Sequence, residues 1–255
     1  MDDLEEPLTG GNVSANLVRI GETVRRPAGP WSLAVHELLR YLEGVGYSGS
    51  PRSLGFDEQG RHVVEYIPGA VVMPFASSSE DANSRLRAVG ELIRDYHNAV
   101  ADFQPPAEAI WNVATPSPTI ELISHHDLAP WNLVSGSRGM VFIDWDAAGP
   151  GSRLWDLSYA AHGFVPLGPE TPDDVAATRL RALVDGYGLD QQSRVQLPPL
   201  IAEHTRAMYD LLHRGSCSGE QPWARLWTAG HGRVWLDHSE FVEARLAMFT
   251  SALVA

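Results

Sequence analysis

One stretch of the chain, residues 125–146, constrains the fold and the chemistry more than any other. It contains the segment His-His-Asp-Leu-Ala-Pro-Trp-Asn and, after a short spacer, the segment Ile-Asp-Trp-Asp. Each polar segment follows a short apolar run, one at 120–123 and the other at 140–143. Runs of this length and composition predict two short strands that lead into polar loops. The sequence therefore predicts a small hairpin with polar side chains gathered at one end.

Three oxygen-bearing side chains fall in these loops, namely Asp127, Asn132 and Asp144. Hard oxygen ligands suit Mg²⁺, which takes one or two protein carboxylates and completes its shell with water and phosphate oxygens. A further carboxylate is then free to orient a hydroxyl group and accept its proton. Any one of these residues alone would more often cap a turn than bind a ligand. Their combined spacing indicates a site for phosphoryl transfer.

The pattern His-x-Asp-x-x-x-x-Asn, followed by an apolar strand and Ile-Asp-Trp, resembles the aminoglycoside phosphotransferase and choline kinase-like family, whose members are relatives of the protein kinases. The resemblance implies that Asp127 is the catalytic base, that Asn132 is a magnesium ligand, and that Asp144 is the principal magnesium ligand. Downstream, the segment Trp-Asp-Leu-Ser-Tyr-Ala at 155–160 resembles the family's Asp-Leu-Ala-Tyr helix start. In that motif the acid, here Asp156, braces the catalytic loop.

The order of predicted elements matches this family. Strand and turn patterns fill 16–26 and 52–67, and one amphipathic helix lies between them. Residues 153–251 are mostly helical by periodicity. We therefore expect an α+β, bilobal, protein-kinase-like fold, with a small β-rich N-lobe over 1–68 and a larger, mostly helical C-lobe over 69–255.

The resemblance also implies a phosphate-covering loop between the first two strands and a cation on the third. Residues 10–14, Gly-Gly-Asn-Val-Ser, lie in the loop position, where glycines let backbone amides approach phosphate. The chain contains no lysine, so the cation must be an arginine. Arg25 is the candidate, with Arg26 next to it, and strand alternation turns only one of them toward the nucleotide.

Two further nucleotide contacts follow from the resemblance. The helix after the third strand should carry an acidic partner for the cation, and Glu37 is in that position. The segment Val-Glu-Tyr-Ile-Pro-Gly at 64–69 matches the family's hinge between lobes. There the backbone of Glu65 and Ile67 would hydrogen-bond the adenine ring.

Other polar residues have plainer interpretations. His97 falls on the apolar face of a predicted helix and should be a buried structural residue, and His125 should support the loop backbone. The pair Glu203 and His204 has no metal-ligand spacing and is interpreted as helix-surface polarity. The late helices form the acceptor wall in this architecture, so acids such as Glu203 and Asp210 are also candidates for acceptor contacts.

The composition of the chain limits which cellular compartment and which binding partners are expected. The net charge of −13 argues against a nucleic-acid partner and is compatible with a cationic substrate, although acidic surfaces also serve solubility. No apolar run approaches the roughly 18 residues that cross a bilayer, so no membrane partner is expected. A single cysteine, Cys217, indicates a reducing compartment, and we expect a cytoplasmic protein. The composition carries no signal for an oligomeric state.

The sequence thus predicts a Mg²⁺-dependent phosphotransferase that moves the γ-phosphoryl group of ATP or GTP to a hydroxyl of a small molecule. A cationic acceptor, such as an aminoglycoside or an amino alcohol, fits the acidic charge. The alternative is a nucleotide-binding pseudokinase or scaffold that has the fold without transfer activity.

Overall fold

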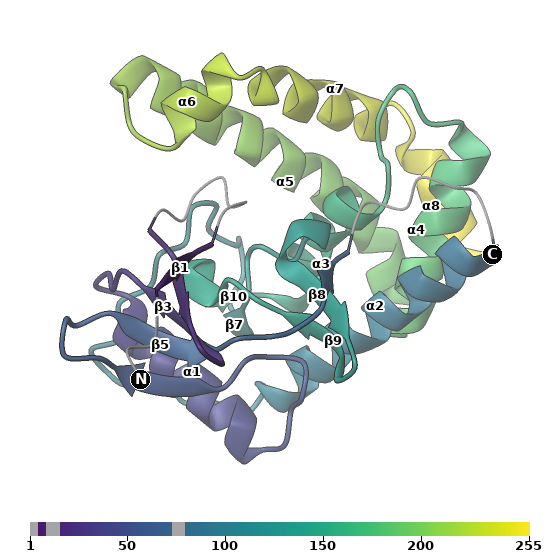
Figure 1. Ribbon diagram of the computed structural model, residues 1–255. Coiled ribbons are helices and arrows are strands. Elements are labelled where there is room, and N and C mark those ends of the chain that lie inside the picture. Colours follow the sequence, from purple (N-terminus) through teal and green to yellow (C-terminus); the bar gives the residue numbers. More distant parts are fainter. Residues whose placement is uncertain (1–4, 9–15, 73–79) are drawn as a thin grey trace.

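A five-stranded antiparallel sheet forms the N-terminal part of the computed structural model, which describes residues 5–8, 16–72 and 80–255. The strand order is β1-β2-β3-β5-β4. The bounds are β1 Glu6–Pro7, β2 Val18–Ile20, β3 Thr23–Arg26, β4 Ser53–Phe56 and β5 His62–Glu65. Helix α1 (Ser32–Gly44) connects β3 to β4 and buries a stripe of aliphatic side chains at helical spacing. Figure 1 shows this small sheet and α1 on one side of the molecule.

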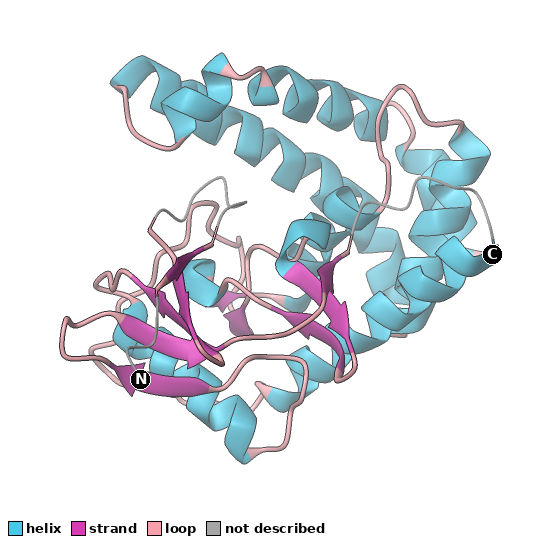
Figure 2. Cartoon of the chain, in the orientation of Figure 1, coloured by secondary structure: helices cyan, strands magenta, loops and turns pink. Residues whose placement is uncertain are grey.

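Helices make up most of the remaining chain (Figure 2). Their bounds are α2 Glu80–Ala99, α3 Arg153–Phe164, α4 Asp173–Tyr187, α5 Gln191–Ser218, α6 Trp223–Thr228, α7 His231–Glu243 and α8 Leu246–Val254. A single buried cluster joins α1 and β5 to α2, α3, α4 and α8. The expected α+β architecture, with a small β-rich part followed by a larger helical part, is confirmed.

Helices α2 and α4 cross in close contact, and glycine makes the crossing possible. A Cβ atom on Gly90 would lie 2.2 Å from the carbonyl oxygen of Leu183, and one on Gly186 would lie 2.0 Å from that of Arg87. Only residues without a side chain fit between these two backbones. The crossing fixes α4 against the helix that carries His97.

The hairpin next to the polar loops differs from the expected one. The run at 120–123 contributes β7 (Leu122–Ser124), which pairs with β10 (Gly149–Gly151). The partner of β9 (Gly139–Phe142) is β8 (Leu133–Gly136), a segment that directly follows the first polar loop. The prediction that the two apolar runs form one hairpin is therefore wrong, because each run pairs with a strand of only three or four residues, which is too short to show a clear pattern.

The chain leaves the five-stranded sheet after Glu65 and joins the second sheet through β6 (Ala70–Val71), which pairs with β8. The expected boundary between the N-lobe and the C-lobe, after residue 68, stays a prediction. The change of sheet at this point agrees with it. The expected phosphate-covering loop at 10–14 lies outside the described residues. None of the helices that the structure describes has the length and apolar character needed to cross a lipid bilayer.

Candidate active site

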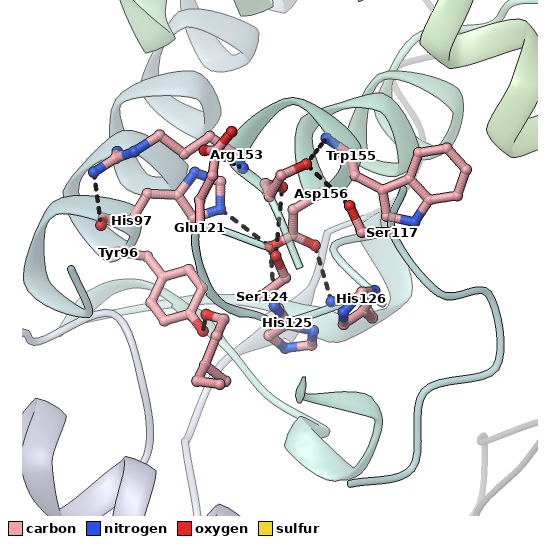
Figure 3. A network of polar contacts seen from close by, with 12 residues as sticks. Tyr96, His97, Ser117, Glu121, Ser124, His125, His126, Arg153, Trp155 and Asp156 are labelled. Atoms are coloured by element: carbon pink, nitrogen blue, oxygen red, sulfur yellow. Dashed lines mark hydrogen bonds and ion pairs between the residues drawn. The ribbon is translucent and has the colours of Figure 1, made fainter. Parts of the chain in front are cut away.

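The loop after β7 is held by the carboxylate of Asp156, which lies in the first turn of α3. Its two oxygens accept the backbone N–H groups of His125 and His126, each at 2.9 Å (Figure 3). His126 has a φ of 62°, an uncommon value for a residue with a side chain. Two backbone hydrogen bonds to one carboxylate hold this bend in place. The bracing expected of Asp156 is confirmed.

Asp156 also contacts His97, whose Nε2 lies 3.1 Å from the carboxylate while its Nδ1 lies 2.8 Å from the Tyr187 hydroxyl. Burial alone would raise the pKa of Asp156, but the hydrogen bond and charge of His97 outweigh it and lower the pKa to about 2. Asp156 is therefore ionised at neutral pH. The prediction that His97 is a buried structural residue is confirmed, since its side chain is fully buried.

His125 supports the loop through both ring nitrogens. Its Nδ1 accepts the backbone N–H of Asp127 at 3.2 Å, so its Nε2 carries the proton and donates to the carbonyl of Ile143, also at 3.2 Å. Burial lowers the pKa of His125 to about 4, which keeps the ring neutral. The expected structural role of His125 is confirmed, and the contact joins the loop of Asp127 to the residue before Asp144.

The carboxylate of Asp127 is oriented by two side chains. The Asn132 amide donates to Asp127 Oδ2 at 2.8 Å and to its backbone carbonyl at 3.0 Å. The Tyr159 hydroxyl, from the second turn of α3, also bonds the carboxylate. Burial raises the pKa of Asp127 to about 6; the charge of Asp144 adds to this rise and the two hydrogen bonds oppose it. A carboxylate with such a pKa is well matched to accept a proton near neutral pH.

Asp144 lies beside Asn132 at the mouth of the β8–β9 hairpin, where the Ile143 N–H donates to the Asn132 carbonyl at 2.8 Å. Its backbone is left-handed, with a φ of 60°, a strained conformation that is typical of functional sites. A single nitrogen of Arg26, Nη2, lies 2.5 Å from Asp144 Oδ1 and 2.7 Å from Asp146 Oδ2. These carboxylates therefore already accommodate a cationic group between them.

This donor set fits a magnesium ion. The described residues contain no group of three or more His, Cys, Asp or Glu side chains that could hold a metal. Mg²⁺ needs fewer, because water and phosphate oxygens supply most of its ligands. Asp144 would provide a carboxylate, and the remaining amide oxygen of Asn132 would provide a second protein ligand.

The arginine that reaches these carboxylates is Arg26 rather than Arg25. The Arg25 guanidinium bonds the Thr23 hydroxyl and lies 3.7 Å from Asp57 on the other face of the sheet. Glu37 forms no ion pair with either arginine among the described residues. It lines a surface pocket together with Arg40 and Tyr41. Of the two arginines, Arg26 is therefore the one that contacts the cluster around Asp144, and Glu37 lies outside this cluster. A phosphate contact by either arginine stays a prediction.

The hinge candidates lie where β5 ends. The Glu65 carboxylate contacts Arg138 at 2.7 Å and Arg52 at 3.4 Å, and its N–H donates to the Arg52 carbonyl. Its side chain therefore ties the β8–β9 turn to the N-terminal sheet. Ile67 is buried against Val134 and Val141, and within the described residues its N–H has no acceptor. An adenine contact through the backbone of these two residues stays a prediction.

Sequence reasoning missed Tyr159 and Asp146 as site residues, although both lie in the motifs that it used. It also misplaced His204 and expected acceptor contacts from two acids of α5. His204 is buried, stacks on Trp155 with ring centroids 4.0 Å apart, and is not a surface residue. Glu203 and Asp210 lie on the face of α5 opposite to the one that packs near Tyr159, so the structure does not bring them to Asp127.

Comparisons with known proteins agree with this geometry. Residues 107–191, which include the loop of Asp127 and the residues around Asp144, match the phosphotransferase enzyme family. The trifolitoxin immunity protein of Rhizobium leguminosarum bv. trifolii is 33% identical over 270 residues, which cover 94% of this chain and 98% of that protein. The chain belongs to the phosphotransferase enzyme family. It is therefore a phosphotransferase of the class that acts on a hydroxyl group.

Solved structures of low sequence identity share the fold of this phosphotransferase. A choline/ethanolamine kinase family protein from Mesorhizobium loti is 18% identical, with a TM-score of 0.65 over 99% of this chain and 93% of that one. The amicoumacin kinase hAmiN, solved with AMP-PNP and Ca²⁺, is 13% identical, with a TM-score of 0.63 over 100% of this chain and 89% of that one. The kinase-like fold expected from the sequence is confirmed.

Proposed function

We propose that this phosphotransferase moves the γ-phosphoryl group of a magnesium-bound nucleoside triphosphate, ATP or GTP, to a hydroxyl of a small cationic molecule. The observation that carries the proposal is the convergence of Asp127, Asn132 and Asp144 with Arg26 from the opposing sheet. Burial raises the pKa of the Asp127 carboxyl to about 6, whereas the Asp144 carboxylate is paired with the Arg26 guanidinium. Phosphoryl transfer uses one carboxylate that accepts a proton and another that holds a cation.

In the proposed reaction, the acceptor oxygen forms a bond to the γ-phosphorus as the bond to the β,γ-bridging oxygen breaks. Asp127 orients the acceptor hydroxyl and takes its proton, and a nucleoside diphosphate leaves. Arg26, which contacts Asp144, neutralises phosphate charge. When bound, Mg²⁺ supplies further neutralisation of the phosphate oxygens, and Asp144 and Asn132 are the residues that would hold it.

Two observations support the proposed class of acceptor, namely the net charge of the chain and its similarity in fold to a known kinase family. The net charge of −13 favours cationic ligands. The M. loti structure with this fold is of the choline/ethanolamine kinase family. Amino alcohols and aminoglycosides are therefore the first acceptors to test, with neutral sugars as the comparison set.

Calorimetric titration with ATP and GTP, with and without Mg²⁺, tests the proposal without knowledge of the acceptor. We expect magnesium-dependent binding in the wild-type protein and its loss in Asp144→Ala. Asp127→Ala should retain nucleotide binding and lose transfer to any acceptor. Asp102→Ala removes an exposed carboxylate and serves as the matched control. Absence of binding for both nucleotides would refute the proposal.

The immunity protein with 33% identity suggests a second candidate, a role in protecting a cell against a toxin. Such protection could arise by phosphorylating the toxin or by binding it without transfer, and the latter corresponds to the scaffold alternative. Expression of wild-type protein and Asp127→Ala in a toxin-sensitive strain separates the two routes. Protection that persists in the variant would assign the role to binding, and protection that is lost would assign it to transfer.

A further inference from the structure

Arg26 reaches two carboxylates of the Ile-Asp-Trp-Asp segment through a single nitrogen. Its Nη2 lies 2.5 Å from Asp144 Oδ1 and 2.7 Å from Asp146 Oδ2. Its Nε is buried and has no hydrogen-bond partner among the described residues. A guanidinium frequently binds one carboxylate with two parallel N–H bonds, which hold it in one orientation. Here the positive group lies instead between two separate acids, which is the arrangement that a bound metal ion adopts.

These three side chains form a partly buried cluster in which charges are poorly screened. The exposed fraction of the side chain is 10% for Arg26, 27% for Asp144 and 22% for Asp146. Burial disfavours the charge on Arg26, but the two carboxylates outweigh it and hold the pKa of the guanidinium above its ordinary value. Arg26 therefore stays protonated and offsets one of the two negative charges that would otherwise attract a divalent ion.

The carboxylate that Arg26 contacts most closely is also the one expected to hold magnesium. Asp144 is the principal metal ligand in the proposed function, and a carboxylate oxygen is the kind of ligand that Mg²⁺ prefers. A divalent ion on Asp144 would put a second positive charge beside the guanidinium, and like charges in a poorly solvated site repel each other. Arg26 can avoid this repulsion by pairing with another negatively charged group. The phosphates of the nucleotide are such a group.

We infer that Arg26 is an internal competitor of the divalent metal at Asp144, and that nucleotide phosphates relieve the competition by drawing the guanidinium away. Without nucleotide, the metal must displace Arg26 and therefore binds weakly. With nucleotide, Arg26 pairs with phosphate and the metal takes its place on Asp144. Each ligand then favours the binding of the other beyond what their direct contact provides, and the metal enters together with the nucleotide. This inference rests on the proposed function.

The affinity for a metal alone tests the competition, with Mn²⁺ as the probe and the electron paramagnetic resonance signal of free Mn²⁺ as the measure of binding. Arg26→Gln removes the charge and should lower the Kd for Mn²⁺ at least about 10-fold, the size of one hydrogen bond between charged groups that no longer opposes the metal. Arg26→Lys keeps the charge and should stay within about 3-fold of the wild-type Kd. Melting temperatures report any change in folding.

Two controls separate this effect from binding of Mn²⁺ by other acids of the chain. In the double variant Arg26→Gln with Asp144→Ala the gain in affinity should disappear, because the carboxylate for which the two cations compete is gone. Arg25→Gln removes the same charge from the neighbouring residue, whose guanidinium lies 3.7 Å from Asp57. This variant should bind Mn²⁺ within about 3-fold of the wild-type Kd, because solvent and salt weaken charge effects that act over a distance.

Titration of the same variants with Mn²⁺–AMP-PNP gives the second readout. Arg26→Gln should raise this Kd at least about 10-fold, so one substitution strengthens binding of the metal and weakens binding of the metal–nucleotide complex.

The possible outcomes separate the inference from the proposed function. If Arg26→Gln leaves the Kd for Mn²⁺ alone unchanged or raises it, or if the gain persists in the double variant, the competition at Asp144 is overturned. An unchanged Kd for Mn²⁺–AMP-PNP in Arg26→Gln would overturn the transfer of Arg26 to phosphate. Failure of the wild-type protein to bind Mn²⁺–AMP-PNP would instead refute the proposed function, while the titrations with Mn²⁺ alone still decide the competition.

Discussion

The hydroxyl of Tyr159 is expected to tune the pKa of Asp127, and its removal is a sharp test of the assigned base. Tyr159→Phe deletes one hydrogen bond to the Asp127 carboxylate and retains the ring. That ring packs near Trp235, with centroids 6.1 Å apart, and near His204, with centroids 5.3 Å apart. The substitution therefore changes the electrostatics of Asp127 with little change in packing.

The magnitude follows from the pKa of Asp127, which is about 6. A hydrogen bond to a charged group contributes about 1.5 kcal/mol or more, and one pKa unit corresponds to about 1.4 kcal/mol. Loss of the bond destabilises the ionised form, so the pKa should rise by about one unit. A base must be ionised to work, hence the rising limb of the pH profile should move to higher pH. At pH 6 the ionised fraction should fall from about one half to about one tenth, while at pH 8 it should hardly change.

Carboxyl-¹³C aspartate labelling measures this pKa without an acceptor, with Asp127→Asn used to assign the signal. Once an acceptor is known, the pH dependence of kcat/KM should show the same displacement. Tyr209→Phe is the control, because Tyr209 belongs to the same aromatic cluster but is not among the groups that shift the pKa of Asp127. A pKa that stays within half a unit of the wild-type value in Tyr159→Phe would refute the assigned contact.

Three further predictions concern the cation, the brace and the helix crossing. Arg26→Ala should weaken Mg²⁺–nucleotide binding at least about 10-fold, while Arg25→Ala should change it less than about 3-fold, as measured by calorimetry. Asp156→Asn should lower the free energy of unfolding at pH 7 by about 2 kcal/mol in urea titrations. The depressed pKa of Asp156 means that its contribution is present above about pH 4 and is lost as the pH falls toward 2. Gly90→Ala should destabilise the fold by about 2 kcal/mol or more, whereas Gly44→Ala, with open space around it, should not. Unchanged unfolding for Asp156→Asn or Gly90→Ala would contradict the packing described here.

The loop of Asp127 could be predicted from the sequence because its interactions are local. Asp127 and Asn132 lie five residues apart in one turn, and Asp156 follows at the start of the next helix, so spacing alone indicates their relationship. The kinase-like order of strands and helices could be predicted for a similar reason. Strong hydrophobic periodicity marks long elements such as α2 and α5.

Long-range pairing could not be predicted in the same way. Strand β3 is four residues long and carries two adjacent arginines, so alternation limits the choice to Arg25 or Arg26 without deciding it. The partner of β9 is a short strand with two exposed residues, which gives no pattern to detect. The pairing of β4 with β5 contains a one-residue bulge, and a bulge changes which face a side chain occupies without any change in composition.

The absence of an amine from this site has a practical consequence. Nucleotide probes that carry a reactive acyl phosphate identify kinases by acylating the amine of a lysine near the phosphates. In the proposed function Arg26 takes that position, and a guanidinium, which stays protonated at neutral pH, is a poor nucleophile. Surveys that depend on amine acylation would therefore pass over this enzyme even when its nucleotide site is fully occupied.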